Sequence, residues 1–534
     1  MSSSMRQTTD GPSSPMNTDV HRVIPAQPFE SLDDYALAGG GAGLRAARAT
    51  STDVVLDELE ASGLRGRGGA GFPTATKWRT VMQHASNTFR TSVIVNAAEG
   101  EPGTFKDRAI LRANPYAVIE GALIAAHVVG SRSVTFATKQ RFGVELARLR
   151  AAIDEVQRAG WCAKVQIEIV EGPAEYLFGE ETALLEVVEG RPPFPRIAPP
   201  WRRGSIELVR DPSNLDSGSG LAADIEMATE GADSVAPPAL VNNVETLANV
   251  PAIIALGAAW FRSIGTMETP GTVVCTISGD VPVPTVIEVA AGEPLRSLLD
   301  RVGDPKEAGL SPVLAVLMGV SNKVLTAAEL DTPISYEGMK AIGGGLGSAT
   351  FTVVDARTDP LALAAGVSRF LAVESCGQCT PCKQDGLNVF ERLRLLGAQG
   401  GTQADLATIR QLLGSIADGA RCNLAAQHQL VVGGIMDAFD DAIQLHLRPD
   451  ARPCEPVLIT ELMSLEAGTA SVDELFLTKR SDWTYDANAA ADASAIGVDD
   501  PGVSPAERQT DHRAGSPAPT PHPAVEPATT AGKV

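Results

Sequence analysis

Hydrophobic and polar residues along the first half of the chain predict strands and helices in turn. Short β-branched runs at 91–95, 133–138 and 165–170 are typical of buried strands. Longer apolar runs with helical spacing separate them, at 115–129 and 145–159. Strands that alternate with helices form sheets covered by helices, so this half is predicted to be an α/β layer.

A second set of elements is predicted after residue 271. Strands are expected at 272–278, 285–289 and 350–354, with a helix at 294–302. These elements indicate a small α+β unit. From Leu361 the pattern is helical. Two amphipathic runs follow at 386–396 and 408–417, and one long helix is predicted over 427–447. The runs predict a C-terminal helical bundle.

The remaining segments lack such patterns. Residues 1–28 and 486–534 have no periodicity and are rich in small and polar residues, so we expect disordered tails. Residues 204–237 predict a surface excursion, and residues 451–485 form an extension that the pattern does not assign. The three domains are expected at 29–265 (α/β), 268–357 (α+β) and 360–450 (helical bundle).

Composition narrows the function classes. The formal net charge of −21 and the pI near 4.8 argue against nucleic acid or an anionic membrane surface as a partner. No run of 18 apolar residues occurs, so we expect no direct membrane insertion. The polar N-terminus predicts no secretory signal, and the seven cysteines suggest metal binding in a reducing compartment. A cytoplasmic location is therefore expected.

A glycine-rich stretch runs from Gly63 to Thr74. It contains G-x-G-x-x-G at Gly66, Gly68 and Gly71, but a helix precedes it where the dinucleotide-binding fingerprint needs a strand. Phe72-Pro73 disfavours a helix directly afterwards. We interpret the stretch as a loop whose backbone N–H groups approach an anion or a flat ring, aided by positive charges from the residues Arg65, Arg67 and Lys77. An ordinary surface loop is the alternative.

Three further polar stretches follow predicted strands or open helices. Asn96 to Arg108 follows the first strand and is typical of a binding loop at a strand's carboxyl end. Gly179-Glu180-Glu181-Thr182 opens a helix, where carboxylates either complement the helix dipole or bind cofactor hydroxyls. Asn242, Asn243 and Thr246 precede an apolar helix and either cap it or bind phosphate.

The strongest chemical signal lies in the predicted bundle. Cys376, Cys379 and Cys382 follow C-x-x-C-x-x-C spacing, and Cys422 lies further along the chain. Three closely spaced thiolates with a distant fourth suit a [4Fe–4S] cluster. Structural zinc prefers paired spacings and remains the alternative.

Taken together, these motifs resemble the flavin-bearing, NADH-oxidising subunit of respiratory complex I. Related proteins are the diaphorase subunits of NAD-linked hydrogenases and formate dehydrogenases. The resemblance runs in order through 63–78, 96–108, 179–190, 242–251 and 374–382, and covers roughly residues 29–447. It implies a Rossmann-like FMN-binding domain, a β-grasp domain, and a helical bundle that holds a [4Fe–4S] cluster.

The resemblance also implies roles for single residues. The residues implied to line FMN are Gly66, Arg67, Gly68, Gly69, Lys77, Asn96, Tyr176, Gly179, Asn242, Asn243 and Thr246. Those implied near the isoalloxazine and the nicotinamide ribose are Glu99, Glu101, Glu180 and Glu181. Phe72 would stack on NADH, and the four cysteines named above would ligate the cluster.

The chain departs from the family's pattern at several positions. Ala98 stands where members usually have Asp, and Thr80 where a second aromatic often follows the glycine-rich stretch. Arg191 replaces a frequent Lys, and the residues beside Cys422 differ from the usual ones. These departures motivate an alternative hypothesis, a non-catalytic homologue with weakened NADH binding.

The implied chemistry belongs to the cofactors, FMN, NAD(H) and the cluster, so no side-chain nucleophile or general base is expected. The resemblance predicts an NADH:acceptor oxidoreductase subunit that passes single electrons to a partner. The expected partners are a thioredoxin-like [2Fe–2S] subunit and further iron–sulfur subunits. Any association with a membrane is expected to go through them. A diaphorase subunit of a soluble hydrogenase or formate dehydrogenase is the second hypothesis.

Overall fold

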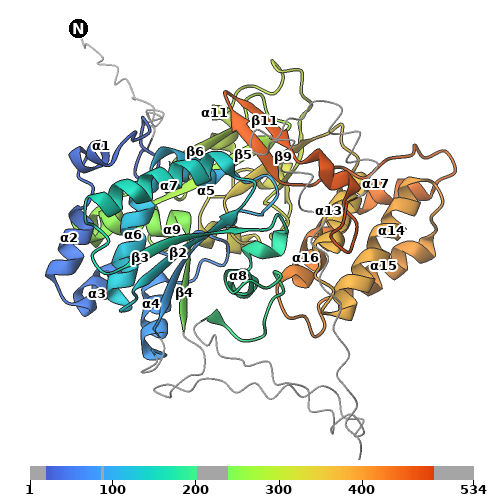
Figure 1. The fold of residues 1–534 in the computed structure, drawn as a ribbon. Helices are drawn as coiled ribbons and strands as arrows, with labels where there is room; N and C mark the ends of the chain where they lie inside the picture. The colour runs from blue at the N-terminus through green and yellow to red at the C-terminus, as the bar shows by residue number, and fades with distance from the viewer. Residues whose placement is uncertain (1–19, 86–89, 201–237, 486–534) are drawn as a thin grey trace, which may run out of the picture. The chain divides into compact units, whose positions relative to one another are not determined.

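The computed structural model describes residues 20–85, 90–200 and 238–485 (Figure 1). Its first sheet is entirely parallel, with strand order β3-β2-β1-β4. The strands are β1 (Ser92–Ala97), β2 (Ser133–Lys139), β3 (Gln166–Gly172) and β4 (Ala239–Asn243). The predicted α/β layer and its strands are confirmed. The predicted excursion 204–237 and the predicted tails, apart from residues 20–28, lie outside the described residues.

Helices cover this sheet and complete its core. They are α5 (Lys106–Ala113), α6 (Pro115–Val128), α7 (Gly143–Arg158), α8 (Glu181–Val188) and α9 (Val244–Leu256). Helix α6 is buried around almost its whole circumference, which explains its continuous apolar run. It begins with Pro115, and the side chain of Asn114 accepts the amide hydrogen of Ala117 at 3.1 Å.

Four short helices precede β1. They are α1 (Leu32–Leu37), α2 (Ala42–Ala49), α3 (Thr52–Ser62) and α4 (Thr74–Gln83). Ser31 and Asp34 form a capping box at the start of α1. Phe72-Pro73 was expected to disfavour a helix directly afterwards, and this was wrong, because α4 begins at Thr74. Pro73 has φ −59°, which is compatible with helix entry.

Residues 20–28 were expected to be disordered, and this was wrong. Val23 is buried, and the amides of Arg22, Val23 and Ile24 all donate to the carboxylate of Glu288 at 2.9 to 3.1 Å. The segment is thus ordered by a residue more than two hundred positions away, which a local pattern cannot show.

The second sheet is mixed, with order β6-β5-β9-β7-β8. Its strands are β5 (Thr272–Gly279), β6 (Thr285–Ala290), β7 (Val313–Leu317), β8 (Leu325–Thr326) and β9 (Thr350–Asp355), with helices α11 (Leu295–Arg301) and α12 (Tyr336–Ala341). A short helix α10 (Ala258–Phe261) leads into it. Strands β5 and β9 are parallel, and the other pairs are antiparallel. The predicted α+β unit is confirmed, although β7, β8 and α12 were not predicted.

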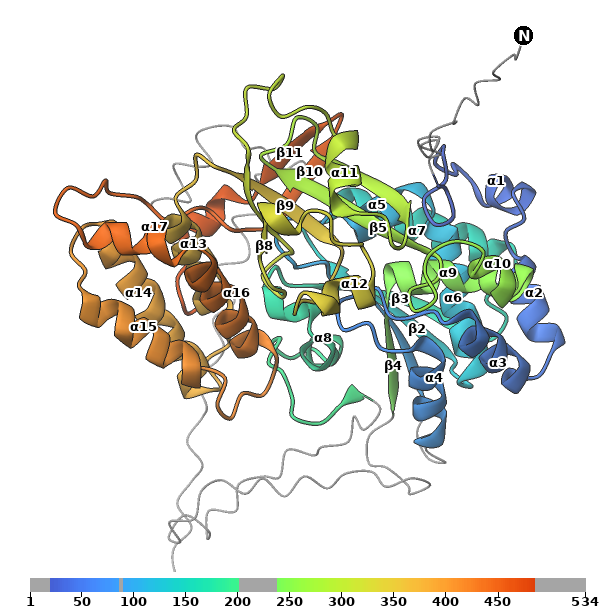
Figure 2. The same cartoon turned by 180° about the vertical axis from the view of Figure 1, so that it is seen from behind.

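The helices that follow, which Figure 2 shows together, pack around a hydrophobic core that also includes Leu177, Ala315 and Phe476 from other parts of the chain. They are α13 (Pro360–Glu374), α14 (Gly386–Gly397), α15 (Gln403–Ser415), α16 (Leu424–Ala438) and α17 (Asp440–Gln444). The single helix predicted over 427–447 was wrong at its C-terminal end, because Phe439, with φ −124°, separates α16 from α17. Among the described helices, none combines the length and apolar character needed to cross a membrane.

Residues 451–485, called the C-terminal segment below, are ordered. They contain the hairpin β10 (Leu462–Glu466) and β11 (Thr469–Val472) and a 3₁₀ turn at Glu474–Thr478. The two turn residues, Ala467 and Gly468, both have positive φ, as a tight two-residue hairpin turn requires.

Candidate functional site

The parallel sheet has its switch point between β1 and β4. Strands β1, β2 and β3 succeed one another to one side, and β4 is added on the other, with Asn96 of β1 in register with Asn243 of β4. In open α/β sheets ligands bind outside the carboxyl ends of strands at such a point. The loop that follows β1 and carries Glu99 and Glu101 leaves the sheet from this edge, where Asn243 ends β4.

The glycine-rich loop (residues 63–73) lies over the N-terminus of α9. The amide of Arg67 donates to Thr246 Oγ1 at 2.9 Å. At Gly68 an added Cβ would lie 3.0 Å from Asn243 Cβ, so only glycine fits there without displacement. The structure therefore brings together three predicted site residues that are far apart in sequence, Gly68, Asn243 and Thr246.

Tyr336 of α12 supports the loop from the second sheet unit and was missed by sequence reasoning. Its hydroxyl donates to Gly66 O at 2.7 Å, and the Arg65 guanidinium lies 3.9 Å from its ring centroid. Gly71, at φ 62°, packs so closely that a Cβ would lie 2.4 Å from the Tyr336 ring. Gly69 adopts φ 141° with open space around it.

Buried charges lie beneath the loop. Lys106 Nζ is 2.7 Å from Asp107, 3.0 Å from Glu245 and 3.2 Å from Asn243. Burial alone would lower the pKa of Lys106, but the neighbouring carboxylates raise it above its ordinary value, so the amine is charged. Lys106 and Glu245 lie inside stretches singled out from the sequence, yet neither was chosen as a site residue.

Arg67 offers unused donors at the same place. Its side chain is buried, with the residue 3% exposed, and Nη2 donates to Pro270 O at 3.3 Å. Nε and Nη1 have no hydrogen-bond partner within the described residues, and Nε lies 3.9 Å from the carboxylate of Glu245, beyond hydrogen-bond reach. Buried donors without partners are costly, and an anionic group bound at the loop would supply the acceptors. This observation fits a phosphate-bearing cofactor.

The Glu99 loop (residues 98–105) connects β1 to α5. Glu99 is buried with φ 38°, and its carboxylate accepts from Asp107 N at 2.6 Å and Arg108 Nε at 2.7 Å. Burial raises the pKa of Glu99 above its ordinary value, and Arg108 opposes that rise. The carboxylate is therefore occupied by the protein's own donors, and its proximity to a nicotinamide stays a prediction.

Glu101, Tyr176 and the helical bundle are joined by hydrogen bonds. Glu101 accepts from the Tyr176 hydroxyl at 2.8 Å and from Val320 N at 2.6 Å. The same hydroxyl lies 3.2 Å from Gln427 Oε1 on α16, and Tyr176 N donates to Glu374 at 2.9 Å. Burial raises the pKa of Glu101 above its ordinary value. Tyr176 thus connects the Glu99 loop to the bundle.

Among the remaining predicted residues, Asn96 and Glu180 form hydrogen bonds within the protein, and Glu181 forms an ion pair. Asn96 Nδ2 donates to Gly179 O at 2.9 Å. Glu180 caps α8 by accepting the amides of Thr182 and Ala183, which supports the helix-dipole interpretation. Burial raises the pKa of Glu180. Glu181 instead forms an ion pair with Lys77.

Two aromatic residues near the loop differ in exposure. Trp78 is fully buried, and its Nε1 donates to Asn242 Oδ1 at 2.8 Å, so the side chain of Asn242 is committed to the core. Phe72 is 49% exposed, which leaves its ring available to a ligand. Trp78 was inside a quoted motif but was not chosen as a site residue.

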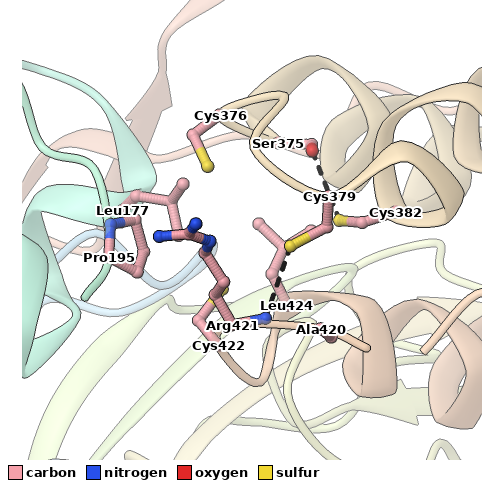
Figure 3. A pocket seen from close by; sticks show the side chains of 10 residues that line it. All are labelled: Leu177, Pro195, Ser375, Cys376, Cys379, Cys382, Ala420, Arg421, Cys422 and Leu424. Atoms are coloured by element: carbon pink, nitrogen blue, oxygen red, sulfur yellow. Dashed lines mark hydrogen bonds between the residues drawn. The ribbon is translucent and has the colours of Figure 1, made fainter. Parts of the chain in front are cut away.

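The four cysteines line one pocket. Figure 3 shows Cys376, Cys379, Cys382 and Cys422 around a common space, with apolar walls from Leu177, Pro195, Ala420 and Leu424. The first three lie in the cysteine loop (residues 375–382), where Gly377 has φ 81° as its sharp path requires. Cys422 comes from the turn before α16. The predicted set is therefore assembled.

The spacing of the sulfurs bears on which metal group fits. Zinc held by four thiolates at about 2.3 Å brings the sulfurs within about 3.8 Å of one another. Here no three of these four sulfurs lie within 4.8 Å of one another, as judged from the described residues. The sulfurs are therefore spaced more widely than a single zinc ion needs, which is the direction that a larger iron–sulfur group requires.

Local donors face these sulfurs. Gln378 Nε2 lies 3.4 Å from Cys376 Sγ, Arg421 N donates to Cys379 Sγ at 3.4 Å, and Ser375 Oγ is 3.3 Å from Cys382 Sγ. Burial raises the pKa of Cys422 to about 12, so without metal this group is a thiol. Metal binding must displace its proton.

Another group of ligand-type side chains is formed by Asp359 and His446 of the helical region and Cys454 of the C-terminal segment. Asp359 caps α13 by accepting Leu361 N at 2.8 Å, and its carboxylate lies 2.9 Å from His446 Nε2. These contacts account for Asp359 and His446 without a metal. Burial raises the pKa of Cys454 to about 12.

A parallel-sheet switch point with a glycine-rich loop, next to a four-cysteine bundle, defines the class of flavin- and iron–sulfur-binding oxidoreductase subunits. Residues 59–252 match the family model of the Nuo51 FMN-binding domain, and residues 362–446 that of the NADH-ubiquinone oxidoreductase-F iron–sulfur binding region. The chain belongs to the family of the NADH-quinone oxidoreductase F subunits.

Individual relatives agree with this. The chain is 36% identical to the NADH-quinone oxidoreductase F subunit of Rhodobacter capsulatus, over 66% of this chain and 78% of the relative. The chain is 33% identical to the NADH-quinone oxidoreductase F subunit of Streptomyces coelicolor, over 80% of this chain and 91% of the relative. It is 31% identical to the NADP-reducing hydrogenase subunit HndC of Solidesulfovibrio fructosivorans, over 82% of this chain and 84% of the relative.

A solved NAD⁺-reducing [NiFe]-hydrogenase, in its H₂-reduced state, has a similar chain. The TM-score is 0.66 at 30% identity, covering 80% of this chain and 68% of that one. The predictions of FMN and an iron–sulfur cluster as cofactors, and of an NADH dehydrogenase flavoprotein, are confirmed by the family matches.

Proposed function

We propose that this chain is the NADH-oxidising subunit of a larger redox complex. The observation that carries the proposal is that the FMN-binding and iron–sulfur regions share one chain and meet at Tyr176, whose hydroxyl contacts Glu101 and Gln427. When bound, FMN takes a hydride from NADH and returns single electrons, which an iron–sulfur cluster accepts. The protein itself holds, orients and shields these groups.

For FMN, the proposed site is the edge of the sheet between β1 and β4. The buried donors of Arg67 that lack hydrogen-bond acceptors support a phosphate at the glycine-rich loop, as judged from the described residues. The further residues assigned to this site are those predicted from the sequence, Gly66, Gly68, Gly69, Lys77, Asn96, Tyr176, Gly179, Asn243 and Thr246. Asn242 acts through Trp78, as a residue that positions the strand end.

For NADH, Phe72 is the proposed stacking residue, because its ring is exposed beside the loop. Glu181 is the carboxylate best placed to meet a ribose, since Glu99, Glu101 and Glu180 are engaged by internal donors. Binding a nucleotide at Glu181 would exchange its ion pair with Lys77 for ligand contacts.

For the cluster, the proposed ligands are Cys376, Cys379, Cys382 and Cys422, and the proposed group is [4Fe–4S]. Leu177, Pro195 and Leu424 give the pocket apolar walls, and the amide and hydroxyl donors noted above tune the sulfurs.

The second sheet is proposed to be a β-grasp domain. Its order β6-β5-β9-β7-β8, with β5 and β9 parallel and α11 crossing between β6 and β7, supports that assignment. The domain boundaries 29–265, 268–357 and 360–450 remain our proposed division of the chain.

The physiological assembly has two candidates. A respiratory complex is favoured by the relatives named as NADH-quinone oxidoreductase F subunits. A soluble hydrogenase diaphorase is supported by the similarity to HndC and to the NAD⁺-reducing hydrogenase. In either case a thioredoxin-like [2Fe–2S] subunit is the proposed electron acceptor, and any contact with a membrane would go through partners.

The test is purification under anaerobic conditions with flavin and metal analysis. We expect one FMN and about four iron atoms per chain, bleaching of the flavin by NADH, and reduction of ferricyanide. NADPH is assayed in parallel. Zinc in place of iron, or bound flavin that neither nucleotide bleaches, would contradict the proposal and favour the non-catalytic homologue. Co-purification of a small [2Fe–2S] protein from the native host tests the proposed acceptor.

A further inference from the structure

The C-terminal segment contacts both the Glu99 loop and the helix that leads into the cysteine loop, and no role has been assigned to it so far. It contributes three buried charged residues, Glu461, Asp473 and Lys479. Each pairs with a residue of the flavin or cluster unit. Buried charges are costly unless paired, so these contacts fix the segment's position closely.

On the flavin side, the segment holds the end of β2. Glu461 lies 2.6 Å from Lys139 Nζ and also pairs with Arg141, which reaches Asp473 at 2.6 Å. Lys139 is 1% exposed, and its Nζ would be 3.3 Å from a Cβ on Gly100. The Glu461 ion pair therefore packs against the backbone of the Glu99 loop.

A second contact reaches the same loop. Arg108, which pairs with Glu99, donates from Nη1 to the carbonyl of Leu462 at 2.7 Å. The guanidinium is thus shared between the loop and the first residue of β10. Both contacts place the segment directly behind the loop that carries Glu99 and Glu101.

On the cluster side, Lys479 pairs with Glu374 at 2.6 Å. Glu374 ends α13 and stands two residues before Cys376, and its other oxygen accepts Tyr176 N at 2.9 Å. Lys479 Nζ lies 5.9 to 6.0 Å from the ring centroids of three aromatic residues of the segment itself. One ammonium therefore connects the segment, the cysteine loop and a predicted flavin residue.

Further bonds hold the same end of α13. Trp483 Nε1 donates to Val373 O at 3.0 Å. Arg369 Nη2 donates to the carbonyls of Phe476 at 3.1 Å and Leu477 at 2.9 Å. Residues from both sides line one cavity, so the two sets of contacts are adjacent. Among them are Gly100, Lys139, Tyr176, Glu374 and Lys479.

We infer that the C-terminal segment holds the cysteine loop in a fixed position relative to the Glu99 loop, and that Lys479 is the positioning residue for electron transfer between them. The inference rests on the proposed function. Electrons must cross from the flavin site to the cysteine pocket, and a small displacement of reacting groups lowers rates steeply. Lys479 touches neither group and acts through Glu374 and Tyr176.

The test compares Lys479→Met with Lys479→Arg in the holoprotein. In Lys479→Met we expect NADH to bleach the flavin within about twofold of the wild-type rate, while reduction of the cluster, followed by EPR after rapid mixing, slows by about tenfold or more. Lys479→Arg keeps the charge and is expected to restore the cluster step at least partly. Equal rates for both steps in all three proteins would overturn the inference.

Hydrogen exchange supplies a readout that does not need turnover. The amide of Tyr176 donates to Glu374, so its exchange is expected to accelerate in Lys479→Met. The matched control is Arg301→Met, which breaks an ion pair with Glu293 inside the second sheet unit. Wild-type exchange at Tyr176 in Lys479→Met, or equal acceleration in the control, would contradict the inference.

A milder variant covers the case in which Lys479→Met loses FMN or iron. Trp483→Phe removes the bond to Val373 O and keeps an aromatic ring of smaller size. Trp483→Phe is also expected to slow reduction of the cluster. A wild-type rate of cluster reduction in this variant would overturn the inference. If NADH does not bleach the flavin bound to the wild-type protein, the proposed function is contradicted. Hydrogen exchange at Tyr176 would still test the positioning role of Lys479 in that case.

Discussion

The ion pair between Glu99 and Arg108 offers a quantitative test of how the Glu99 loop is held. Arg108 is 1% exposed, and its Nε lies 2.7 Å from Glu99. Its guanidinium also lies 4.1 Å from the Phe105 ring centroid and 4.5 Å from that of Phe142. Arg108→Met keeps much of this packing but leaves a buried carboxylate without its cation.

Removing one partner of a buried ion pair costs about 3–5 kcal/mol. The amides of Asp107 and Arg108 still donate to Glu99 after the change, which argues for the lower part of that range. The control is Arg150→Met, whose partner Glu171 and whose own side chain are both more than a third exposed. An exposed pair contributes about 0–1 kcal/mol.

The assay is urea-induced release of bound flavin, followed by fluorescence. With a urea slope of about 2–3 kcal/mol per M, the midpoint for Arg108→Met should fall by about 1–2 M. Adding Glu99→Gln to Arg108→Met removes the stranded charge and should recover much of the loss. A fall no larger than that of Arg150→Met would refute the reasoning.

The dependence on pH gives a second check. Burial raises the pKa of Glu99, and Arg108 opposes that rise. A carboxyl whose folded-state pKa is raised holds a proton that the unfolded chain has released, so its contribution to stability falls as pH rises. Without Arg108 the pKa rises further. The loss of stability in Arg108→Met, relative to the wild-type protein, is therefore expected to be larger at about pH 8 than at about pH 5. The opposite trend would contradict this account.

Three further predictions concern the two cofactor sites. Cys382→Ser should lose most of its iron while keeping flavin, as measured by metal analysis and absorbance; retained iron would exclude that residue as a ligand. Gly71→Ala should weaken flavin retention on a desalting column, because the new Cβ would lie 2.4 Å from the Tyr336 ring and the position has φ 62°; full retention would show that the loop tolerates the shift. Lys77→Met frees Glu181 from the ion pair that a bound nucleotide would displace, and should lower KM for NADH in the flavin-loaded protein while leaving iron content unchanged; an unaltered KM would remove Glu181 from the nucleotide site.

The sequence by itself determined the local elements and the kinds of chemistry. Periodicity placed the first three strands of the parallel sheet, because a buried strand must be apolar and β-branched. The spacing of Cys376, Cys379 and Cys382 indicated a metal group, because few other roles require three thiolates on one turn. These signals are local, so one stretch of sequence suffices to detect them.

Other features could not be predicted in this way, because they depend on residues that only folding brings together. Tyr336 supports Gly66 from α12, and Glu288 orders Val23. The wide sulfur spacing that favours a cluster over zinc is likewise a property of the assembled pocket, as judged from the described part of the chain.

The C-terminal segment is the clearest case. Its own residues show no periodicity, yet Glu461 and Lys479 are buried against Lys139 and Glu374, which lie in two other units. A charged residue in a sequence is by default exposed, and only a partner at close range makes its burial tolerable. Tertiary structure therefore decided where these charges lie and what they hold together.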